Sequence, residues 1–179
     1  MRSLHVFILL GVVLVAIAIV ARSGILTRDN PGEPASKYMR ASMDTPQTPQ
    51  LSTEEVAVIA EKFPTATVSP SGVRYLIIAP GAGEGKPRRG QLVTVQYEGR
   101  LLLDGTKFDS SYDRHKTFTF QVGIGRVIPG GDATLVDMKQ GEKRTVIIPW
   151  WLAYGAKGHP TVIPPKASLV FDIELLDFR

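Results

Sequence analysis

The loop between residues 153 and 165 carries the side chains best suited to a functional site. It reads Ala-Tyr-Gly-Ala-Lys-Gly-His-Pro-Thr-Val-Ile-Pro-Pro and leads into an alternating apolar segment, Leu169 to Leu176. Loops supported by a rigid sheet are where binding and catalytic groups concentrate. This loop holds no pair of nucleophile and base and no cluster of metal ligands. We therefore predict a site that works through shape, apolar surface and the hydroxyl of Tyr154.

Other chemistries lack the residue patterns that they require. The stretch from Gly81 to Lys86 has the wrong spacing for a phosphate-binding loop, and no Ser or Thr follows its lysine. Outside the apolar N-terminus, the histidines are His115 and His159, which lack metal-site spacing. Ser110 and Ser111 lack the Gly-x-Ser-x-Gly motif of a hydrolase. Because the chain also has no cysteine, thiol catalysis is excluded, and we expect no metal and no cofactor.

The distribution of charge argues against a nucleic-acid partner. The formal net charge is +4 at pH 7, and the only tight basic cluster is Lys86-Pro87-Arg88-Arg89. Domains that bind nucleic acids usually carry a denser basic surface. We interpret this cluster as a solvated loop.

An apolar segment from Leu4 to Ala21 opens the chain, between Arg2 and Arg22. A membrane-spanning helix needs roughly 17–25 apolar residues, whereas the apolar region of a cleaved signal has about 7–15. The segment falls between these two classes, and we favour an uncleaved signal anchor over a cleaved signal peptide. A buried core helix is disfavoured because the segment has no polar face.

Two opposing signals bear on the orientation of this segment. More basic residues follow it than precede it, which by the positive-inside rule places the C-terminal domain in the cytoplasm; they are Arg22, Arg28, Lys37 and Arg40. An apolar stretch directly behind Arg2 is instead typical of an export signal. We expect export, with a single span in the cell membrane and a periplasmic or other extracytoplasmic domain. A cleaved signal would release the protein to the periplasm.

The remaining sequence divides into a linker and a domain. Residues 22–71 form the predicted linker, because its first half is rich in Pro, Ser, Thr and Gln without an apolar period. Within it, Ser52 and Glu55 have the spacing of a capping box, which predicts one short helix that ends before Pro64. The predicted domain spans residues 72–179.

Alternation of apolar and polar residues predicts several strands in this domain. Alternating runs lie at 93–98, 118–122, 145–148 and 169–176, an apolar run lies at 73–79, and turn residues separate them. One helix is predicted from about Asp132 to Met138, ahead of Gly141. These elements define an α+β domain, in which a bent antiparallel β-sheet wraps around one short α-helix.

Aromatic and aliphatic residues gather at the ends of these strands and in the loops. They are Tyr97, Phe108, Phe118, Phe120, Val127, Ile128, Tyr154, Val162, Ile163 and Phe171. Core packing alone would account for Tyr97, Phe120 and Phe171, which fall on strands. The residues in turn-rich segments favour a concave apolar pocket with a few polar groups.

Several motifs occur in a characteristic order and spacing. They are Val95-Gln96-Tyr97-Glu98-Gly99, the run from Asp104 to Ser111, Phe118-Thr119-Phe120, Gly125-Arg126-Val127-Ile128-Pro129-Gly130, Ala153-Tyr154-Gly155-Ala156, and Ile163-Pro164-Pro165 through Leu175. With these motifs, the sequence resembles the FKBP family of peptidyl-prolyl cis–trans isomerases, the macrolide-binding immunophilins. The resemblance spans about residues 72–177, and the segment from Ile148 to Gly155 has the length common in bacterial members.

The resemblance implies a set of site residues. The pocket would be lined by Tyr97, Phe108, Phe118, Val127, Ile128, Tyr154, Val162, Ile163 and Phe171, with Phe120 and His159 at its margin. By the same resemblance, the hydroxyl of Tyr154 and the backbone N–H of Ile128 bind the ligand. Asp109 faces the reacting carbonyl, held by Tyr97 and Arg114. The alternative for Asp109 and Arg114 is a plain loop ion pair, which contributes little when exposed.

The resemblance also implies the activity and the partners. The expected function is isomerisation of X-Pro bonds during the folding of exported proteins, with Tyr97, Asp109, Tyr154 and Phe171 as catalytic residues. Proline-containing polypeptides and macrolides are the expected ligands, residues 4–21 are expected to contact the membrane, and the protein is expected to be a monomer.

One position departs from the family pattern. The family commonly places tryptophan, or another bulky apolar residue, where this chain has Gly131, and the resemblance makes that position the pocket floor. Either Trp151 or Met138 fills the space, or the pocket is deeper and binds macrolides more weakly. The alternative function is a non-catalytic chaperone or peptide-binding module with the same fold.

Overall fold

The computed structural model describes residues 48–179, and the predicted signal anchor and most of the predicted linker lie outside this range. The described residues belong to one compact unit from Pro49 to Arg179. This unit includes the short helix that the sequence places in the linker. Between residues 48 and 179, no helix is both long enough and apolar enough to cross a membrane.

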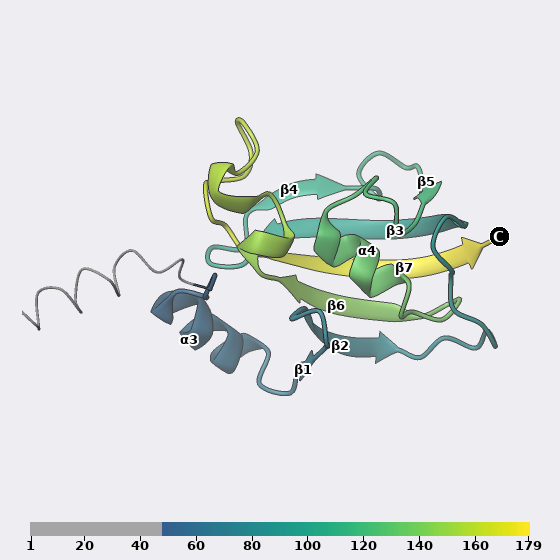
Figure 1. Ribbon diagram of the computed structural model, residues 1–179, viewed down its shortest axis with the longest axis horizontal. Coiled ribbons are helices and arrows are strands. Elements are labelled where there is room, and N and C mark those ends of the chain that lie inside the picture. The colour runs from purple at the N-terminus through teal and green to yellow at the C-terminus, as the bar shows by residue number, and fades with distance from the viewer. Residues whose placement is uncertain (1–47) are drawn as a thin grey trace, which may run out of the picture. The chain divides into compact units, whose positions relative to one another are not determined.

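A seven-stranded antiparallel sheet forms the framework of the unit (Figure 1). The strand order is β1-β2-β6-β7-β3-β4, and β5 pairs with β3 beside this path. The strands are β1 (Thr67–Val68), β2 (Arg74–Ala79), β3 (Leu92–Leu101), β4 (Lys107–Ser110), β5 (Phe118–Gln121), β6 (Lys143–Ile148) and β7 (Leu169–Phe178). The helices are α3 (Thr53–Lys62), α4 (Pro129–Leu135), and two 3-10 turns, η1 (Trp150–Leu152) and η2 (Gly155–Lys157).

The predicted architecture, an antiparallel sheet with one short helix on its face, is confirmed. The helix α4 lies across β3, β6 and β7 (Figure 1), but it begins at Pro129, earlier than the predicted Asp132. Proline is well suited to the first position of a helix, because its fixed φ is helical and its missing N–H would be unsatisfied there. The early start places Gly130 and Gly131 inside the helix.

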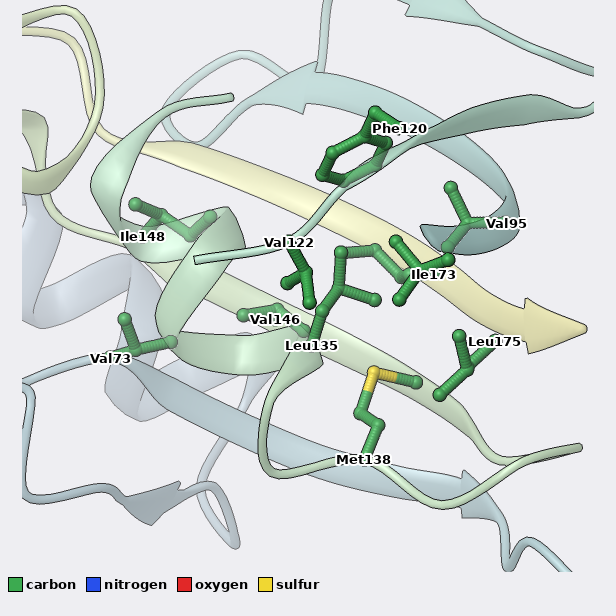
Figure 2. Packing of buried hydrophobic residues seen from close by; sticks show 11 residues of the cluster. Val73, Val95, Phe120, Val122, Leu135, Met138, Val146, Ile148, Ile173 and Leu175 are labelled. Atoms are coloured by element: carbon green, nitrogen blue, oxygen red, sulfur yellow. The ribbon is translucent and has the colours of Figure 1, made fainter. Parts of the chain in front are cut away.

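The main core lies between α4 and the sheet (Figure 2). It follows from the period of two along the strands, since Val93 and Val95 of β3 and Ile173 and Leu175 of β7 turn to the same face. Leu135 of α4 packs onto them. The other members of this cluster are Val73, Phe120, Val122, Met138, Val146 and Ile148.

The helix α3 covers the opposite face of the sheet. Ile59 packs with Leu102, Ile147 and Val170, the last two of which alternate with core residues of β6 and β7. The predicted capping box is confirmed, because Glu55 N donates to Ser52 Oγ at 3.1 Å and Ser52 N donates to Glu55 Oε2 at 2.8 Å. Both faces of the central strands are therefore buried.

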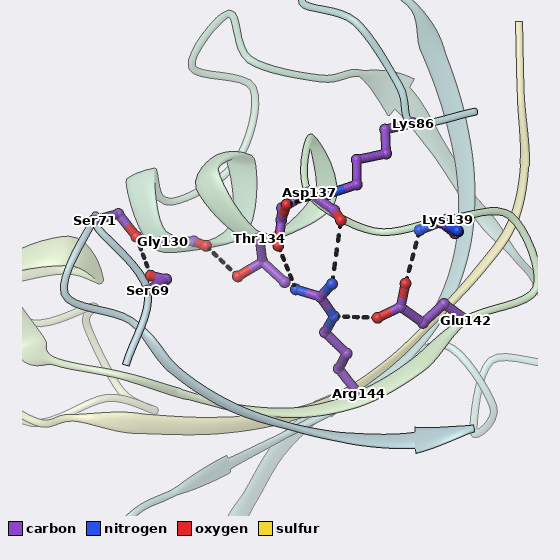
Figure 3. A network of polar contacts seen from close by, with 9 residues as sticks. All are labelled: Ser69, Ser71, Lys86, Gly130, Thr134, Asp137, Lys139, Glu142 and Arg144. Carbon is purple, nitrogen blue, oxygen red and sulfur yellow. Dashed lines mark hydrogen bonds and ion pairs between the residues drawn. The ribbon is translucent and has the colours of Figure 1, made fainter. Parts of the chain in front are cut away.

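A buried ionic cluster fastens the turn after α4 to β6 (Figure 3). The side chain of Arg144 is only 5% exposed and donates from Nε to Glu142. Its two other nitrogens donate to Asp137 Oδ2 and to the Asp137 carbonyl, each at 3.1 Å. The guanidinium also stacks over the ring of Tyr75, 4.3 Å from its centroid. Lys86 joins the cluster through Asp137.

Candidate active site

A cavity of about 250 Å³ opens between the N-terminal end of α4 and the strands β3, β4, β5 and β7. Its volume lies near the lower end of the range for small-molecule sites, so it suits a small ring or side chain. Mostly apolar residues line it: Val95, Tyr97, Phe108, Asp109, Phe118, Phe120, Arg126, Val127, Ile128, Gly131, Leu135, Ile148, Tyr154, Phe171 and Ile173.

Aromatic rings form one wall of the cavity. Phe108 and Phe171 meet edge to face with centroids 5.6 Å apart, and Tyr97 and Phe118 do so at 6.0 Å. The first pair requires Gly99 on β3, because a Cβ there would lie 2.7 Å from atoms of both rings. Because Gly99 has no side chain, the rings of Phe108 and Phe171 can both pack closely against the backbone of β3.

One corner of the cavity is polar. The Tyr97 hydroxyl donates to Asp109 Oδ2 at 2.5 Å, while Arg114 donates to Asp109 Oδ1 and, at 2.8 Å, to the Tyr97 oxygen. Burial raises the pKa of Tyr97, and its hydrogen bond to Asp109 adds to the rise, so the phenol stays protonated at neutral pH. The charge of Asp109 is balanced by that of Arg114.

The Tyr154 hydroxyl and the backbone N–H of Ile128, the residue that precedes α4, belong to residues that line the cavity, and neither donor has an acceptor among residues 48–179. Burial raises the pKa of Tyr154, and the negative charge of Asp109 contributes to the rise, so this hydroxyl also remains a donor. Both donors are available to an acceptor, such as a carbonyl oxygen, on a bound molecule.

The floor of the cavity, which the family resemblance places at Gly131, carries no side chain at that position. The atoms nearest to a Cβ built there are Val127 Cγ2 at 3.3 Å, Ile128 Cγ1 at 3.6 Å and Val127 Cβ at 3.8 Å. Neither predicted substitute fills the space, since Met138 is buried in the core and Trp151 packs edge to face on Trp150. Leu135, Ile148 and Ile173 line the cavity instead.

The structure brings together most of the residues that the sequence singles out. Those that line the cavity are Tyr97, Phe108, Asp109, Phe118, Phe120, Val127, Ile128, Tyr154 and Phe171.

The other three lie outside this lining, because the loop folds back on itself. His159 and Ile163 pair across a turn, with N···O distances of 2.9 and 3.0 Å. Val162 at the turn is 46% exposed, whereas Ile163 is buried. The His159 ring contacts Tyr154 edge to face at 5.4 Å.

Five residues that line the cavity were not predicted from the sequence to belong to the site. Four are core residues that serve the site as well, namely Val95, Leu135, Ile148 and Ile173. Alternation along the strands indicates that Val95 and Ile173 are buried but does not indicate that a cavity reaches them. The fifth is Arg126. Its position directly before Val127, a predicted pocket residue, is the sequence signal that could have placed it at the cavity.

The comparisons with known proteins agree with this geometry. The family model described as FKBP-type peptidyl-prolyl cis-trans isomerase matches residues 83–176. The chain is 50% identical over 105 residues to peptidyl-prolyl cis-trans isomerase Fkbp12 of Drosophila melanogaster, covering 59% of this chain and 96% of the relative. It is 52% identical over 94 residues to peptidyl-prolyl cis-trans isomerase FPR2 of Saccharomyces cerevisiae, covering 52% and 70%.

A third relative, FK506-binding protein 1A of Emericella nidulans, is 49% identical over 105 residues, covering 59% of this chain and 96% of its own. Among solved structures, the crystal structure of AtFKBP13 superposes with a TM-score of 0.59 at 39% identity, covering 64% of this chain and 98% of the other.

In this domain a short helix packs against an antiparallel sheet, and a mostly apolar, aromatic-rich cavity lies between them. This chain belongs to the FKBP-type peptidyl-prolyl cis-trans isomerase family. The prediction of an enzyme of this class is confirmed, since relatives at about half identity are named peptidyl-prolyl cis-trans isomerases.

Proposed function

We propose that the chain accelerates the isomerisation of X-Pro bonds by holding the twisted amide in the cavity between α4 and the sheet. The observation that carries this proposal is the pairing of two unused donors, Tyr154 Oη and Ile128 N, with apolar walls. A peptide carbonyl is an acceptor flanked by apolar groups, so it matches such a site.

Rotation about an amide bond needs no nucleophile and no acid. The barrier of ~18–20 kcal/mol arises because rotation destroys the resonance of the C–N bond. An unaided X-Pro bond therefore isomerises in tens to hundreds of seconds, which is slow enough to limit folding. A protein lowers this barrier if it binds the twisted amide more tightly than the planar one.

Apolar walls favour the twisted amide. A planar amide has a more polar carbonyl than a twisted amide, so the loss of water on entering the cavity costs the planar form more. Phe118, Phe171 and Val127 supply this dry surface.

The donors then fix the geometry. The Ile128 N–H and the Tyr154 hydroxyl hold substrate carbonyls, which limits the amide to orientations close to the transition state. Asp109, fixed by Tyr97 and Arg114, faces the reacting carbonyl.

The first test is the loss of activity on removal of these groups. In the full chain, purified in mild detergent, we expect Phe171→Ala and Asp109→Ala each to lower kcat/KM for a prolyl peptide by about a hundredfold, because the amide is no longer held in place. Phe63→Ala is the matched control, since Phe63 packs on the opposite face of the sheet. A similar loss of activity in Phe63→Ala would show that the effect comes from general destabilisation.

The second test is the pH profile. The raised pKa values of Tyr97 and Tyr154 extend the range in which both phenols donate, since a tyrosine ordinarily ionises near pH 10.0. We expect kcat/KM to be flat from about pH 7.5 to 9.5 and to fall only above that range. Tyr154→Phe should lower the plateau by roughly two- to tenfold, the value of one hydrogen bond. A decline that begins below about pH 9 would contradict the assignment of the hydroxyls as donors.

We further propose that the clients are proteins exported across the membrane. The support is the apolar segment from Leu4 to Ala21, which is typical of a signal anchor. Cleavage of the domain by added protease only after the outer membrane is permeabilised would indicate the periplasm. Protection that persists after this permeabilisation would place the domain in the cytoplasm and contradict the proposal.

A second candidate is a non-catalytic module that binds proline-containing segments or, weakly, macrolides of the FK506 type. The open floor at Gly131 favours it, because a proline ring would lack an aromatic surface beneath it. Peptide binding without any rate above background in the unmodified chain would establish this candidate over the first.

A further inference from the structure

The rim of the cavity carries a cation without a carboxylate partner. Arg126 lines the cavity and is exposed, and it forms no ion pair or side-chain hydrogen bond within residues 48–179. The other charged lining residue, Asp109, is already balanced by Arg114. The cavity as a whole therefore presents one uncompensated positive charge to an incoming chain.

The nearby acidic side chain is engaged elsewhere. Asp132 of α4 accepts hydrogen bonds from Gly123 N at 2.8 Å and from Gly125 N at 2.9 Å. These bonds hold the turn that precedes Arg126, where both glycines have positive φ. Within residues 48–179, Asp132 and Arg126 form no ion pair, so Asp132 holds the turn before Arg126 without binding its guanidinium.

The place of Arg126 relative to the binding groups is set by the chain. It directly precedes Val127 in the apolar wall, and it lies two residues before Ile128, which also lines the cavity. When a substrate carbonyl is held at Ile128, the residues next to the substrate's proline therefore pass beside the guanidinium of Arg126. A guanidinium binds a carboxylate through two parallel hydrogen bonds, which gives orientation as well as attraction.

We propose that Arg126 selects X-Pro segments in which an acidic residue adjoins the proline. The inference rests on the proposed function, because it names the substrate class of the same cavity. Lysine at the same substrate position is disfavoured by repulsion. The effect is moderate and depends on salt, because the guanidinium is exposed.

The experiment uses the full chain in mild detergent and two series of tetrapeptides. One series has Glu, Gln or Lys before the proline, and the other has the same residues after it. In one of the two series we expect kcat/KM for Glu to exceed that for Lys by about fivefold at low salt, and the ratio to approach one in 0.5 M NaCl. Arg126→Gln should bring the low-salt ratio close to one, and Arg126→Glu should invert it.

The matched control is Arg88→Gln. It removes the same charge from an exposed position that does not line the cavity. The Glu-to-Lys ratio should survive in this variant. A ratio that falls equally in Arg88→Gln and Arg126→Gln would show that net charge alone steers the peptides, and would overturn the assignment to Arg126.

Peptide affinity, measured by fluorescence anisotropy on the same peptides, separates this inference from the proposed function. No isomerisation of any peptide would refute the proposed catalysis, while a preference for Glu in binding, lost in Arg126→Gln, would still support the role of Arg126. Equal rates and equal affinities for Glu and Lys in both series would refute that role, whatever the catalytic rate.

Discussion

Replacing Gly131 with tryptophan is expected to tighten the binding of FK506 by roughly 30-fold. The indole would add an aromatic surface to the cavity lining at Gly131, after a small shift of Val127, whose Cγ2 would lie 3.3 Å from the new Cβ. Aromatic side chains bury ~150–250 Å², and if about half of that area meets the ligand, ~25 cal/mol per Å² gives about 2 kcal/mol. Isothermal titration of the natural chain and of Gly131→Trp measures the difference.

Gly131→Ala is the control for this substitution. It adds a Cβ at 3.3 Å from Val127 Cγ2, which requires a small shift of that side chain, and it changes the helix propensity of α4 without building a floor. We expect its affinity to stay within about threefold of the natural chain, because little ligand contact is added. Equal affinities in the natural chain and in Gly131→Trp would show that the floor is supplied by other residues.

The second large effect concerns stability. Arg144→Met is expected to lower the free energy of unfolding by about 3–5 kcal/mol, because it leaves Glu142 buried without its cation. The stack on Tyr75 and the bonds to Asp137 are lost as well. Chemical denaturation followed by circular dichroism measures the change, and the melting temperature should fall by roughly 10 °C or more.

An exposed arginine provides the comparison. Arg100 pairs with Glu98 and Asp172 at a side-chain exposure of 35%, so Arg100→Met should cost about 1 kcal/mol or less. The double substitution Arg144→Met with Glu142→Leu removes both buried charges and should recover part of the loss. If Arg144→Met were as stable as the natural chain, the ionic cluster would have no role in holding the turn after α4.

The strands were predictable where burial imposes a period of two. Val93 and Val95 on β3, and the alternation along β7, place these strands in the sheet without any tertiary information. The strand β1 has two residues and β4 has a single apolar residue, Phe108, so neither shows a period, and their pairing depends on neighbours distant in sequence. The helix α4 begins before the predicted Asp132 because Pro129, Gly130 and Gly131 carry no apolar period that would mark them as helical.

The candidate site was predictable in its apolar part. The aromatic residues on strands reach the cavity because the sheet register brings Phe171 opposite Gly99. The loop beyond Tyr154 was harder, since Thr161 adopts a positive φ of 75° that no sequence pattern announces. That turn carries Val162 toward solvent. The cluster around Arg144 likewise joins residues from separate elements, which a reading along the chain does not connect.

The lining of the cavity and the core of the domain share several residues. Val95, Leu135, Ile148 and Ile173 belong to both. Because the cavity exists only in the folded state, occupancy and folding are thermodynamically linked: a ligand at 100 times its Kd adds about 2.7 kcal/mol to the stability of the folded state. The melting temperature measured at increasing ligand concentration therefore reports the affinity of the site. Because Leu135 and Ile148 serve both the core and the cavity, a substitution at either is expected to change the shape of the pocket and the stability of the domain together.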